Sequence, residues 1–442
     1  MSAIPPTTDL LTLELQTIRG LIEAEQLPQA AQALNALQRK APRDARVPLL
    51  GMRLAERVGN LANATQAARR ALALAPDWHV AQIELALLLA KQKQADEAMR
   101  LAMQAVAGAP HEAQVMVGAI NVALFSERTE QTLRWAEDGV RRFPDHAGMR
   151  LFLARFLVAQ GRPADAVPHY EFVLERAPDH EEALHGLLGC AQATQDEATA
   201  RRCADRLLAL KPFDENARYW HAVVHGQTPP TQPPGVVTEI FDSQAERFDV
   251  HLVRGLQYRV PDLVAKRLLE LHPDRRFNLL DLGCGTGLVG VYLGRIEGHI
   301  IGVDLSGKMI EQAARHQIYS RFHQVNVLDA LRETPADHYE AITAADVLIY
   351  VGDLTPVLPD ALRILKPGGH FVFSCEAAGE DEADLVLRTP SNRYAHKASS
   401  VERQCRQAGF DPVEIEHLPS LRTEGGQPLP GFLVTARKPL AG

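Results

Sequence analysis

Small and hydrophobic positions recur with a fixed period through the first half of the chain. Prolines stand 34 residues apart, and small residues twelve positions before them keep the same phase: Pro42, Pro76, Pro110, Pro144, Pro178 and Pro212, with Ala30, Ala64, Ala98, Thr132, Ala166 and Ala200. Within a period, apolar residues recur at helical spacing, as in Ile83, Leu87 and Leu88. Because proline stops a helix and small residues let two helices approach, each period predicts a helix–turn–helix unit that stacks on its neighbours.

These features predict an all-α solenoid of about six repeats over residues 11–216, closed by a capping helix at Asp214–His225. We place this repeat domain at residues 1–225. The next stretch, Gly226–Gly235, has four prolines in ten residues, which favours an extended spacer. We therefore expect a linker at 226–236 and a second domain at 237–442.

Beyond the linker the pattern changes to short apolar runs that alternate with helical stretches. After an amphipathic helical region at Val236–Leu271, the strand-like runs are Phe277–Leu282, His299–Val303, Phe322–Val325, Ala341–Ala345 and His370–Cys375, with helical patterns at Lys308–His316 and Leu354–Leu365. Such alternation predicts an α/β doubly wound, Rossmann-like domain with helices on both faces of a parallel sheet. Two later runs, Pro412–His417 and Gly431–Arg437, are separated by the turn-rich Thr423–Pro430 and predict an antiparallel pair at the sheet edge.

Composition restricts the class of protein without changing this division. The 442 residues are 46% hydrophobic and 23% charged, as in a globular chain, and the net charge of -8 leaves no basic footprint for nucleic acid. The 5 cysteines are scattered and no cluster of metal ligands is evident, so we expect neither a disulfide framework nor a metal site. The stretch Met1–Leu11 does not resemble a secretion signal, and Val115–Phe125 is too short to span a bilayer. We expect a cytoplasmic protein without membrane or nucleic-acid partners.

The strongest chemical motif, Asp281–Gly287, follows the first predicted strand and reads DLGCGTG. Its glycines allow the backbone to turn tightly and to approach a ligand. A dinucleotide fingerprint would need a glycine where Leu288 stands, which weighs against a nicotinamide cofactor. A carboxylate at Asp281 would also repel a diphosphate and attract the ammonium of an amino-acid moiety.

Two further carboxylates come at the ends of later strands. Asp304 ends the second predicted strand, where a carboxylate can accept both ribose hydroxyls, and Asp329 follows the third, within reach of an adenine amine. Ligands of open α/β sheets bind at this edge. Each aspartate alone could equally be a helix cap or a turn residue, but their joint spacing indicates a single cofactor site.

This set of motifs resembles the tetratricopeptide-repeat proteins that carry a class I S-adenosylmethionine-dependent methyltransferase domain. In the first half, residues at most of the aromatic positions of the tetratricopeptide repeat differ from the family pattern. In the second half, residues 237–438 resemble the methyltransferase domain. Further matches are an aromatic-rich segment, Phe241–Asp249 with Leu256, Tyr258 and Pro261, and the turn Lys366–Gly369 before the fifth strand.

The resemblance implies S-adenosyl-L-methionine as the cofactor. The glycine loop and Asp281 would hold the methionine part, Asp304 the ribose and Asp329 the adenine amine. Leu305 and Met309 would pack on adenine, although Met309 and Tyr258 are individually typical core residues. The cofactor-binding residues expected on this basis are Asp281, Gly283, Cys284, Gly285, Gly287, Asp304, Leu305, Met309, Leu328, Asp329, Ala345 and Tyr258.

The implied reaction is methyl transfer to an oxygen or nitrogen acceptor. The sulfonium donor is already activated, so the protein mainly orients the reactants and excludes water. Asp346, Tyr350 and His396 are candidates for a general base, although Asp346 could instead close the cofactor site and His396 could be a surface-exposed side chain. No Asn-Pro-Pro-Tyr motif follows the fourth strand, which weighs against amide or adenine N-methylation.

The leading hypothesis is an enzyme that methylates a protein, a peptide or a protein-attached group held on the concave face of the repeats. Two alternatives stay open: a small-molecule methyltransferase whose repeats serve oligomerisation, and a scaffold that binds S-adenosylmethionine without turnover. A nicotinamide-dependent dehydrogenase is the remaining alternative. The repeats predict a protein or peptide partner without naming it, and a homo-oligomer is compatible with the sequence.

Overall fold

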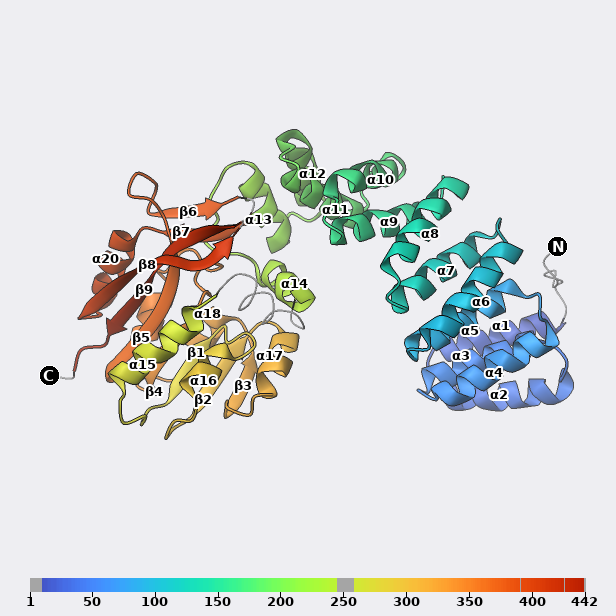
Figure 1. Ribbon diagram of the computed structural model, residues 1–442, viewed down its shortest axis with the longest axis horizontal. Coiled ribbons are helices and arrows are strands. Elements are labelled where there is room, and N and C mark those ends of the chain that lie inside the picture. The colour runs from blue at the N-terminus through green and yellow to red at the C-terminus, as the bar shows by residue number, and fades with distance from the viewer. Residues whose placement is uncertain (1–9, 245–257, 390, 425, 441–442) are drawn as a thin grey trace. The chain divides into compact units, whose positions relative to one another are not determined.

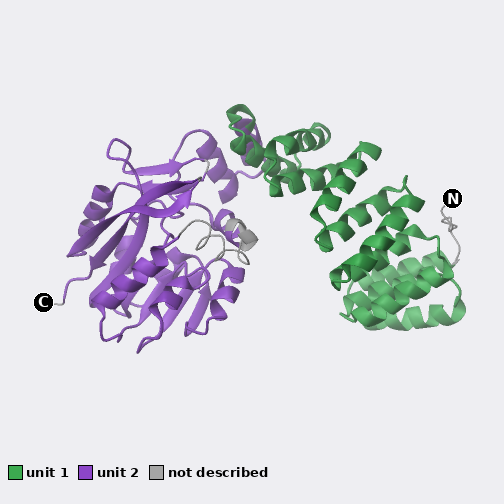
Figure 2. Ribbon diagram, in the orientation of Figure 1, with its two compact units in different colours: residues 1–199 green, residues 200–442 purple. Residues whose placement is uncertain are grey.

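The computed structural model describes residues 10–244, 258–389, 391–424 and 426–440. It divides into two compact units, residues 1–199 and residues 200–442 (Figure 2). The division falls inside helix α12 (Glu197–Leu210), ahead of the proline-rich segment. The domain limits taken from the sequence, 1–225, 226–236 and 237–442, stay a prediction.

The first unit is an array of helices joined by short turns (Figure 1). Its helices are α1 (Leu10–Glu23), α2 (Leu27–Lys40), α3 (Arg46–Arg57), α4 (Leu61–Leu74), α5 (His79–Lys91), α6 (Ala95–Gly108), α7 (Ala113–Phe125), α8 (Thr129–Arg142), α9 (Ala147–Ala159), α10 (Pro163–Arg176) and α11 (Glu181–Ala193).

The periodic residues have the structural roles that their spacing predicts. The second helix of each repeat ends two residues before a proline, as α4 does at Leu74 before Pro76. The small residues lie where consecutive helices pack: Ala30, Ala64, Ala98, Thr132 and Ala166 are all 0% exposed. A larger side chain there would hold the paired helices apart. The predicted helical solenoid is therefore confirmed.

The second unit holds a nine-stranded mixed sheet and its covering helices. Its elements after α12 are α13 (Glu215–Val224), α14 (Pro234–Gln244), α15 (Val260–Leu271), β1 (Leu279–Leu282), α16 (Leu288–Leu293), β2 (Ile300–Asp304), α17 (Gly307–Ala314), β3 (Arg321–Gln324), α18 (Val327–Glu333), β4 (Tyr339–Ala344), α19 (Val357–Ile364), β5 (Leu365–Ala377), β6 (Leu385–Arg388), β7 (Arg393–His396), α20 (Ala398–Ala408), β8 (Val413–Glu424) and β9 (Gln427–Arg437).

The central strands run in the order β3-β2-β1-β4-β5 and are all parallel, and β9 is antiparallel to β5 and β8. Successive strand residues feed opposite faces: Ile342 and Phe371 pack under α18, α19 and α20, whereas Ala341 and Val372 pack under α15 and α16. Two apolar layers therefore cover the sheet, which confirms the predicted doubly wound α/β architecture.

Three details differ from the sequence-based expectation. The segment Thr423–Pro430 is not mainly turn, because β8 and β9 pair almost to their tip, where Glu424 lies opposite Gln427. Strands β6 and β7 were not predicted; each is four residues long and antiparallel to the other. Lys366–Gly369 lies within β5 as an irregularity of its pairing with β4. The β8–β9 tip and the β6–β7 pair are local hairpins, whereas the irregularity in β5 depends on its pairing with the sequence-distant β4.

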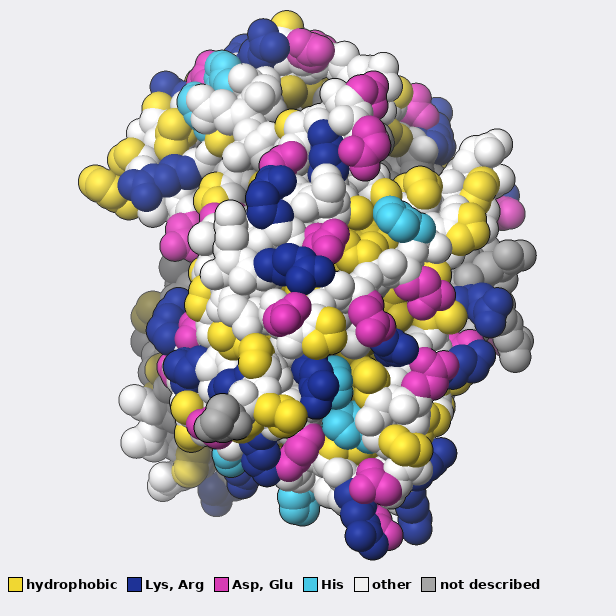
Figure 3. Space-filling model, turned by 90° about the vertical axis from the view of Figure 1, so that its left-hand side faces the viewer, with side chains coloured by type: hydrophobic (Ala, Val, Ile, Leu, Met, Phe, Trp, Pro, Cys, Tyr) yellow, Lys and Arg dark blue, Asp and Glu magenta, His cyan; other side chains and the backbone are white. Residues whose placement is uncertain are grey.

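Among the described residues, no helix is long and apolar enough to cross a membrane. Exposed Lys and Arg side chains are interspersed with Asp and Glu on the face drawn in Figure 3, and neither sign dominates it. That face therefore offers a mixed rather than a single-sign electrostatic surface.

Two half-buried histidines, His272 at the end of α15 and His370 in β5, are expected to make the fold sensitive to acid. The rings of His272 and His370 lie 5.5 Å apart, and His272 Nε2 and His370 Nδ1 have no hydrogen-bond partner in the described part of the chain. Burial lowers the pKa of His370 to about 4 from the ordinary 6.5, and the charges of His272 and of two nearby arginines act in the same direction. At pH values between 4 and 6.5, His370 is protonated to a greater extent in the unfolded chain than in the folded chain. The stability that the neutral, buried ring contributes is therefore complete above pH 6.5 and is lost as the pH falls toward 4.

We therefore expect His370→Gln to reduce the fall in melting temperature between pH 7 and pH 4, as followed by thermal unfolding. The exposed His316→Gln is the matched control and should leave the pH dependence of the wild type in place. A His370→Gln profile that is superimposable on the wild-type profile would contradict the assignment.

Candidate cofactor site

A pocket of about 370 Å³ opens at the carboxyl ends of β1, β2 and β4. This volume lies within the range of small-molecule sites, roughly 300–1,000 Å³. One wall is built by the loop after β1, by the ends of β2 and β4 and by the start of α18. The lining also includes the loop 345–351 after β4, together with Gln232, Phe241, Arg393 and Arg422. The pocket therefore lies where the sequence placed the cofactor.

The glycine loop keeps its shape because three of its residues adopt left-handed backbone conformations. The φ angles of Gly283, Gly285 and Gly287 are 60°, 53° and 84°. A Cβ on Gly283 would also lie 2.4 Å from Val347 Cγ2, so the site has no room for a side chain there. The Cys284 amide donates to the Val303 carbonyl at 2.9 Å, which holds the loop against β2.

Asp304 joins the end of β2 to this loop. One carboxylate oxygen accepts from the Gly285 amide at 2.8 Å, and the other accepts from the Ser306 amide at 2.9 Å. The side chain lines the pocket and the residue is 9% exposed. A buried carboxylate at a strand end, with the glycine loop beside it, can accept hydroxyl donors from a bound ligand.

Asp281 lies at the level of the sheet and does not line the pocket. Its two oxygens accept from the Tyr319 hydroxyl at 2.6 Å and the Thr343 hydroxyl at 2.7 Å. Burial raises the pKa of Asp281 to about 6, against the lowering effect of these two hydrogen bonds. The carboxyl therefore ties β1 to β4 and to the chain ahead of β3.

The pocket brings together most of the residues expected from the sequence. It is lined by Gly283, Cys284, Gly285, Asp304, Leu305, Leu328, Ala345 and Tyr258, and by the base candidates Asp346 and Tyr350. Asp281, Gly287, Met309, Asp329 and His396 are not among its lining residues. Residues 245–257, which hold the predicted Arg247–Asp249 and Leu256, lie outside the described residues.

Two of the residues away from the pocket wall have clear alternative roles. Met309 is fully buried in α17 and packs in the core. Asp329 is half-exposed on α18 and pairs with Arg332 at 3.0 Å. This pair uses one carboxylate oxygen, and the contact between Asp329 and adenine stays a prediction.

The expectation that His396 is exposed is wrong. The residue lies in β7, is 2% exposed, and its Nε2 donates to the Gly352 carbonyl at 2.6 Å. Burial lowers the pKa of His396. The neutral ring is thus a structural tie to the loop after β4. The prediction was wrong because the polar residues around His396 are typical of a surface loop, whereas β7 lies between β5 and β6 and pairs with both.

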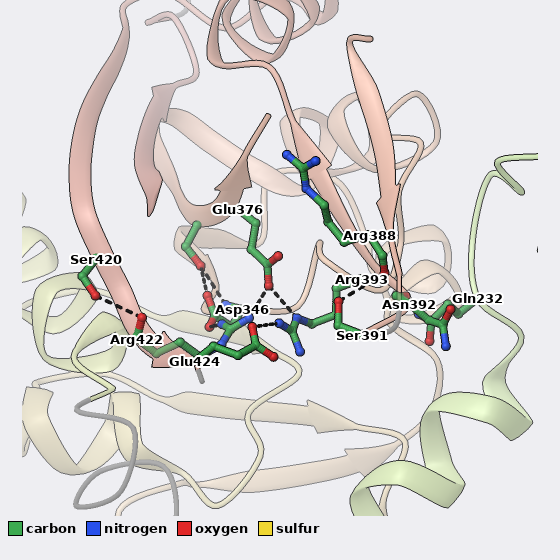
Figure 4. A network of polar contacts seen from close by, with 11 residues as sticks. Gln232, Asp346, Glu376, Arg388, Ser391, Asn392, Arg393, Ser420, Arg422 and Glu424 are labelled. Atoms are coloured by element: carbon green, nitrogen blue, oxygen red, sulfur yellow. Dashed lines mark hydrogen bonds and ion pairs between the residues drawn. The ribbon is translucent and has the colours of Figure 1, made fainter. Parts of the chain in front are cut away.

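An ion-pair network forms a second part of the pocket wall (Figure 4). Arg422 of β8 lies between Asp346, which follows β4, and Glu376 of β5, and pairs with both. Arg393 of β7 pairs with the same Glu376 at 2.6 Å and with Glu424. Burial alone would lower the pKa of Arg422, but the two carboxylates raise it above its ordinary value. This wall therefore carries fixed, mutually compensating charges.

The network changes the interpretation of the base candidates. Asp346 accepts from the Ser374 hydroxyl at 2.7 Å as well as pairing with Arg422, so both of its oxygens are occupied. Burial raises the pKa of Tyr350 to about 12, although Arg393 and Arg422 act in the opposite direction. The phenol is therefore protonated at neutral pH and can donate a hydrogen bond into the pocket.

The proline-rich segment is also part of this wall, which the sequence did not indicate. The backbone amide of Gln232 donates to the Tyr350 carbonyl at 3.1 Å, and its side-chain amide donates to the backbone carbonyl of Asn392. The Tyr394 hydroxyl donates to the Pro229 carbonyl at 2.7 Å. Proline content predicts an extended backbone but does not identify the surface against which that backbone lies.

The chain also resembles known proteins in both units. Residues 252–415 match the family described as "Methyltransferase domain", and residues 157–223 match the tetratricopeptide repeat. A phosphoethanolamine N-methyltransferase of Triticum aestivum is 27% identical over 155 residues, which cover 34% of this chain and 30% of that protein. A ubiquinone biosynthesis O-methyltransferase of Alkalilimnicola ehrlichii is 29% identical over 138 residues, which cover 30% of this chain and 53% of that protein.

The chain thus spans about a third to a half of the length of these curated relatives. Among solved structures, the 1,6-didemethyltoxoflavin-N1-methyltransferase of Burkholderia thailandensis, with bound S-adenosylhomocysteine, is 20% identical at a TM-score of 0.38, covering 48% of this chain and 93% of that one. The two family matches agree with the helical array and with the parallel sheet that carries the glycine loop. The chain therefore consists of a tetratricopeptide repeat region followed by a class I S-adenosylmethionine-dependent methyltransferase domain.

Proposed function

We propose that the chain transfers the methyl group of S-adenosyl-L-methionine to an oxygen or nitrogen acceptor. The observation that carries this proposal is the meeting of the glycine loop and Asp304 at one wall of the pocket, with Gly285 donating to the carboxylate. Because a carboxylate oxygen can accept more than one hydrogen bond, Asp304 can accept a ribose hydroxyl while it keeps the Gly285 amide as a donor. The glycines of this loop have no side chains, so its backbone can lie close to the methionine part.

Leu305 and Leu328, which line the same wall, would flank the adenine, and Ala345 would leave space for the sulfonium. The bound sulfonium supplies an activated methyl group. The residues of the chain bind and orient the reactants and exclude water, and an acceptor atom must approach to roughly 3–3.5 Å opposite the sulfur. The buried carboxyl of Asp281 lies under this loop and adds negative charge near the ammonium of the methionine part.

The acceptor would enter on the side of the ion-pair network. Tyr350 and Arg393 line that side, and the Phe241 ring stands edge-on to the Tyr350 ring with centroids 5.3 Å apart. Because the Tyr350 phenol stays protonated, we assign it a positioning role as a hydrogen-bond donor and not the role of a base. Asp346 is committed to Arg422 and orients that wall.

The class of acceptor has two candidates. A tetratricopeptide array is typical of protein–protein interaction, so we propose that the repeats dock a protein or peptide that is then methylated. The relatives named above are named for phosphoethanolamine and for ubiquinone biosynthesis, which favours a small-molecule acceptor as the second candidate, with the repeats serving oligomerisation. A scaffold that binds the cofactor without turnover is the third.

Radiolabelled methyl transfer into a cell lysate, separated into protein and small-molecule fractions, distinguishes these three. Label in protein supports docking, label in the small-molecule fraction supports the second candidate, and no label together with tight S-adenosylhomocysteine binding supports the scaffold. Calorimetry with S-adenosylhomocysteine and with NAD tests the cofactor class itself. Binding of NAD alone would overturn the proposal.

Removal of residues 1–199 tests the docking role separately. This cut removes one compact unit and keeps the segment 229–232 that contacts the pocket wall. We expect unchanged S-adenosylhomocysteine affinity, and a loss of about 100-fold or more in the methylation of a protein acceptor, because docking raises the local concentration of a bound substrate. Full turnover of that acceptor by the shortened chain would contradict docking.

A further inference from the structure

Three side chains on α12 and α13, outside the pocket, converge as metal ligands. His221 and His225 are four residues apart at the end of α13, and Asp205 faces them from α12. One oxygen of Asp205 lies 2.8 Å from His225 Nε2 and 3.3 Å from His221 Nε2. The two imidazole rings have centroids 4.4 Å apart. All three ligand atoms lie within 4.8 Å of one another.

We propose that Asp205, His221 and His225 bind one divalent transition-metal ion such as Zn²⁺. Bonds of about 2.0–2.2 Å to nitrogen and oxygen place the ligand atoms of a tetrahedral ion about 3.3 Å apart. The two observed nitrogen–oxygen distances, 2.8 and 3.3 Å, are already close to this value. An ion bound between these atoms would replace the hydrogen bond of His225 and the contact of His221 with Asp205.

The ligand types select the metal. Imidazole nitrogens suit Zn²⁺, Ni²⁺ and Cu²⁺, whereas Mg²⁺ and Ca²⁺ prefer oxygen ligands. Two histidines four residues apart lie on one face of a helix, which is the spacing that lets both bind one ion. Three protein ligands leave one position of a tetrahedral ion for water.

The location also favours a cation. His221 lies in the last turn of α13 and His225 is its C-cap, where the unpaired carbonyls give the helix end a partial negative charge. Arg201 of α12 already uses this end of the helix, since its Nε donates to the Val224 carbonyl at 3.1 Å. The two helices are thus held together at this point before any ion binds.

Binding at this site would stabilise the chain next to the pocket. Helix α13 leads directly into the proline-rich segment, where Pro229, Pro230 and Gln232 bond to the wall formed by Tyr394, Asp353 and Tyr350. An ion that links α13 to α12 holds the start of this segment in place. The site is independent of methyl transfer, because none of its ligands lines the pocket.

Metal binding to the untagged, chelator-treated full chain tests the proposal. Titration calorimetry with Zn²⁺ should give one site per chain with micromolar or tighter affinity, unaffected by excess Mg²⁺. His221→Ala, His225→Ala and Asp205→Asn should each weaken binding more than about tenfold. His316→Gln, an exposed histidine elsewhere in the same unit, is the matched control and should bind as the wild type does.

Two further readouts connect binding to these residues and not to the other histidines. Co²⁺ in place of Zn²⁺ should give visible absorption in the wild type that His225→Ala loses. Zn²⁺ at 100 times its dissociation constant should raise the melting temperature by about 5 °C in the wild type and not in the double variant His221→Ala/His225→Ala. Zn²⁺ affinity that is equal in the wild type and this double variant would overturn the site.

Discussion

Replacing Asp304 by alanine is expected to weaken S-adenosylhomocysteine binding by about 10- to 100-fold, or roughly 1.5–3 kcal/mol. The variant loses the carboxylate that would accept the ribose hydroxyls, and hydrogen bonds to a charged group are the stronger kind. It also removes the acceptor of the Gly285 and Ser306 amides, so the glycine loop loses one of its ties to β2. Titration calorimetry measures the change.

Asp304→Asn and Asp329→Ala are the informative companions. The amide of Asp304→Asn keeps one acceptor oxygen and should retain part of the affinity. Asp329 is half-exposed and paired with Arg332, so Asp329→Ala should change the affinity by less than about fivefold. Unchanged affinity in Asp304→Ala would remove Asp304 from the site, and a large loss in Asp329→Ala would restore the predicted adenine contact.

Replacing Arg422 by methionine is expected to destabilise the C-terminal unit by about 3–5 kcal/mol. The side chain of Arg422 is 7% exposed, and those of its partners Asp346 and Glu376 are 11% and 2% exposed. Of the side-chain contacts described for these two carboxylates, Asp346 would keep only the hydrogen bond from the Ser374 hydroxyl. Glu376 would keep only its ion pair with Arg393. The cost arises because Asp346 loses its cation and Glu376 loses one of two, at positions where water cannot solvate them.

Scanning calorimetry of the full chain, with and without S-adenosylhomocysteine, measures this loss, because the transition that the ligand shifts belongs to the methyltransferase domain. We expect that transition to fall by about 10 °C in Arg422→Met. Arg422→Met/Asp346→Asn should recover part of the loss, since it removes one unpaired charge. Arg406→Met, which breaks a half-exposed pair with Glu402, is the matched control with an expected change of about 0–1 kcal/mol. A shift in Arg422→Met no larger than in this control would contradict the role of the network.

Local residue patterns were enough to predict both architectures and the part of the pocket that the glycine loop and Asp304 form. The 34-residue period of proline and small residues is a repeated local rule, so it predicted the helices and the buried column from Ala30 to Ala166. The glycine loop and Asp304 were equally predictable, because a tight strand-to-helix turn and a strand-end carboxylate are properties of short segments. Such features depend on neighbours within a few residues, which a single sequence contains.

The rest of the pocket wall depends on contacts between residues that are far apart in the chain. Arg422 pairs with Asp346 and Glu376, which are 76 and 46 residues away in the sequence. His396 is buried because its strand pairs with β5, a strand that the local sequence does not identify. Gln232 belongs to the segment that we predicted as a linker, but it contacts the pocket wall. From the sequence we expected no metal site, because Asp205 comes from another helix than His221 and His225. The physical reason is the same in each case: charge pairing, burial and ligand convergence depend on distances in space, and chain folding brings together groups whose local patterns are those of ordinary surface residues.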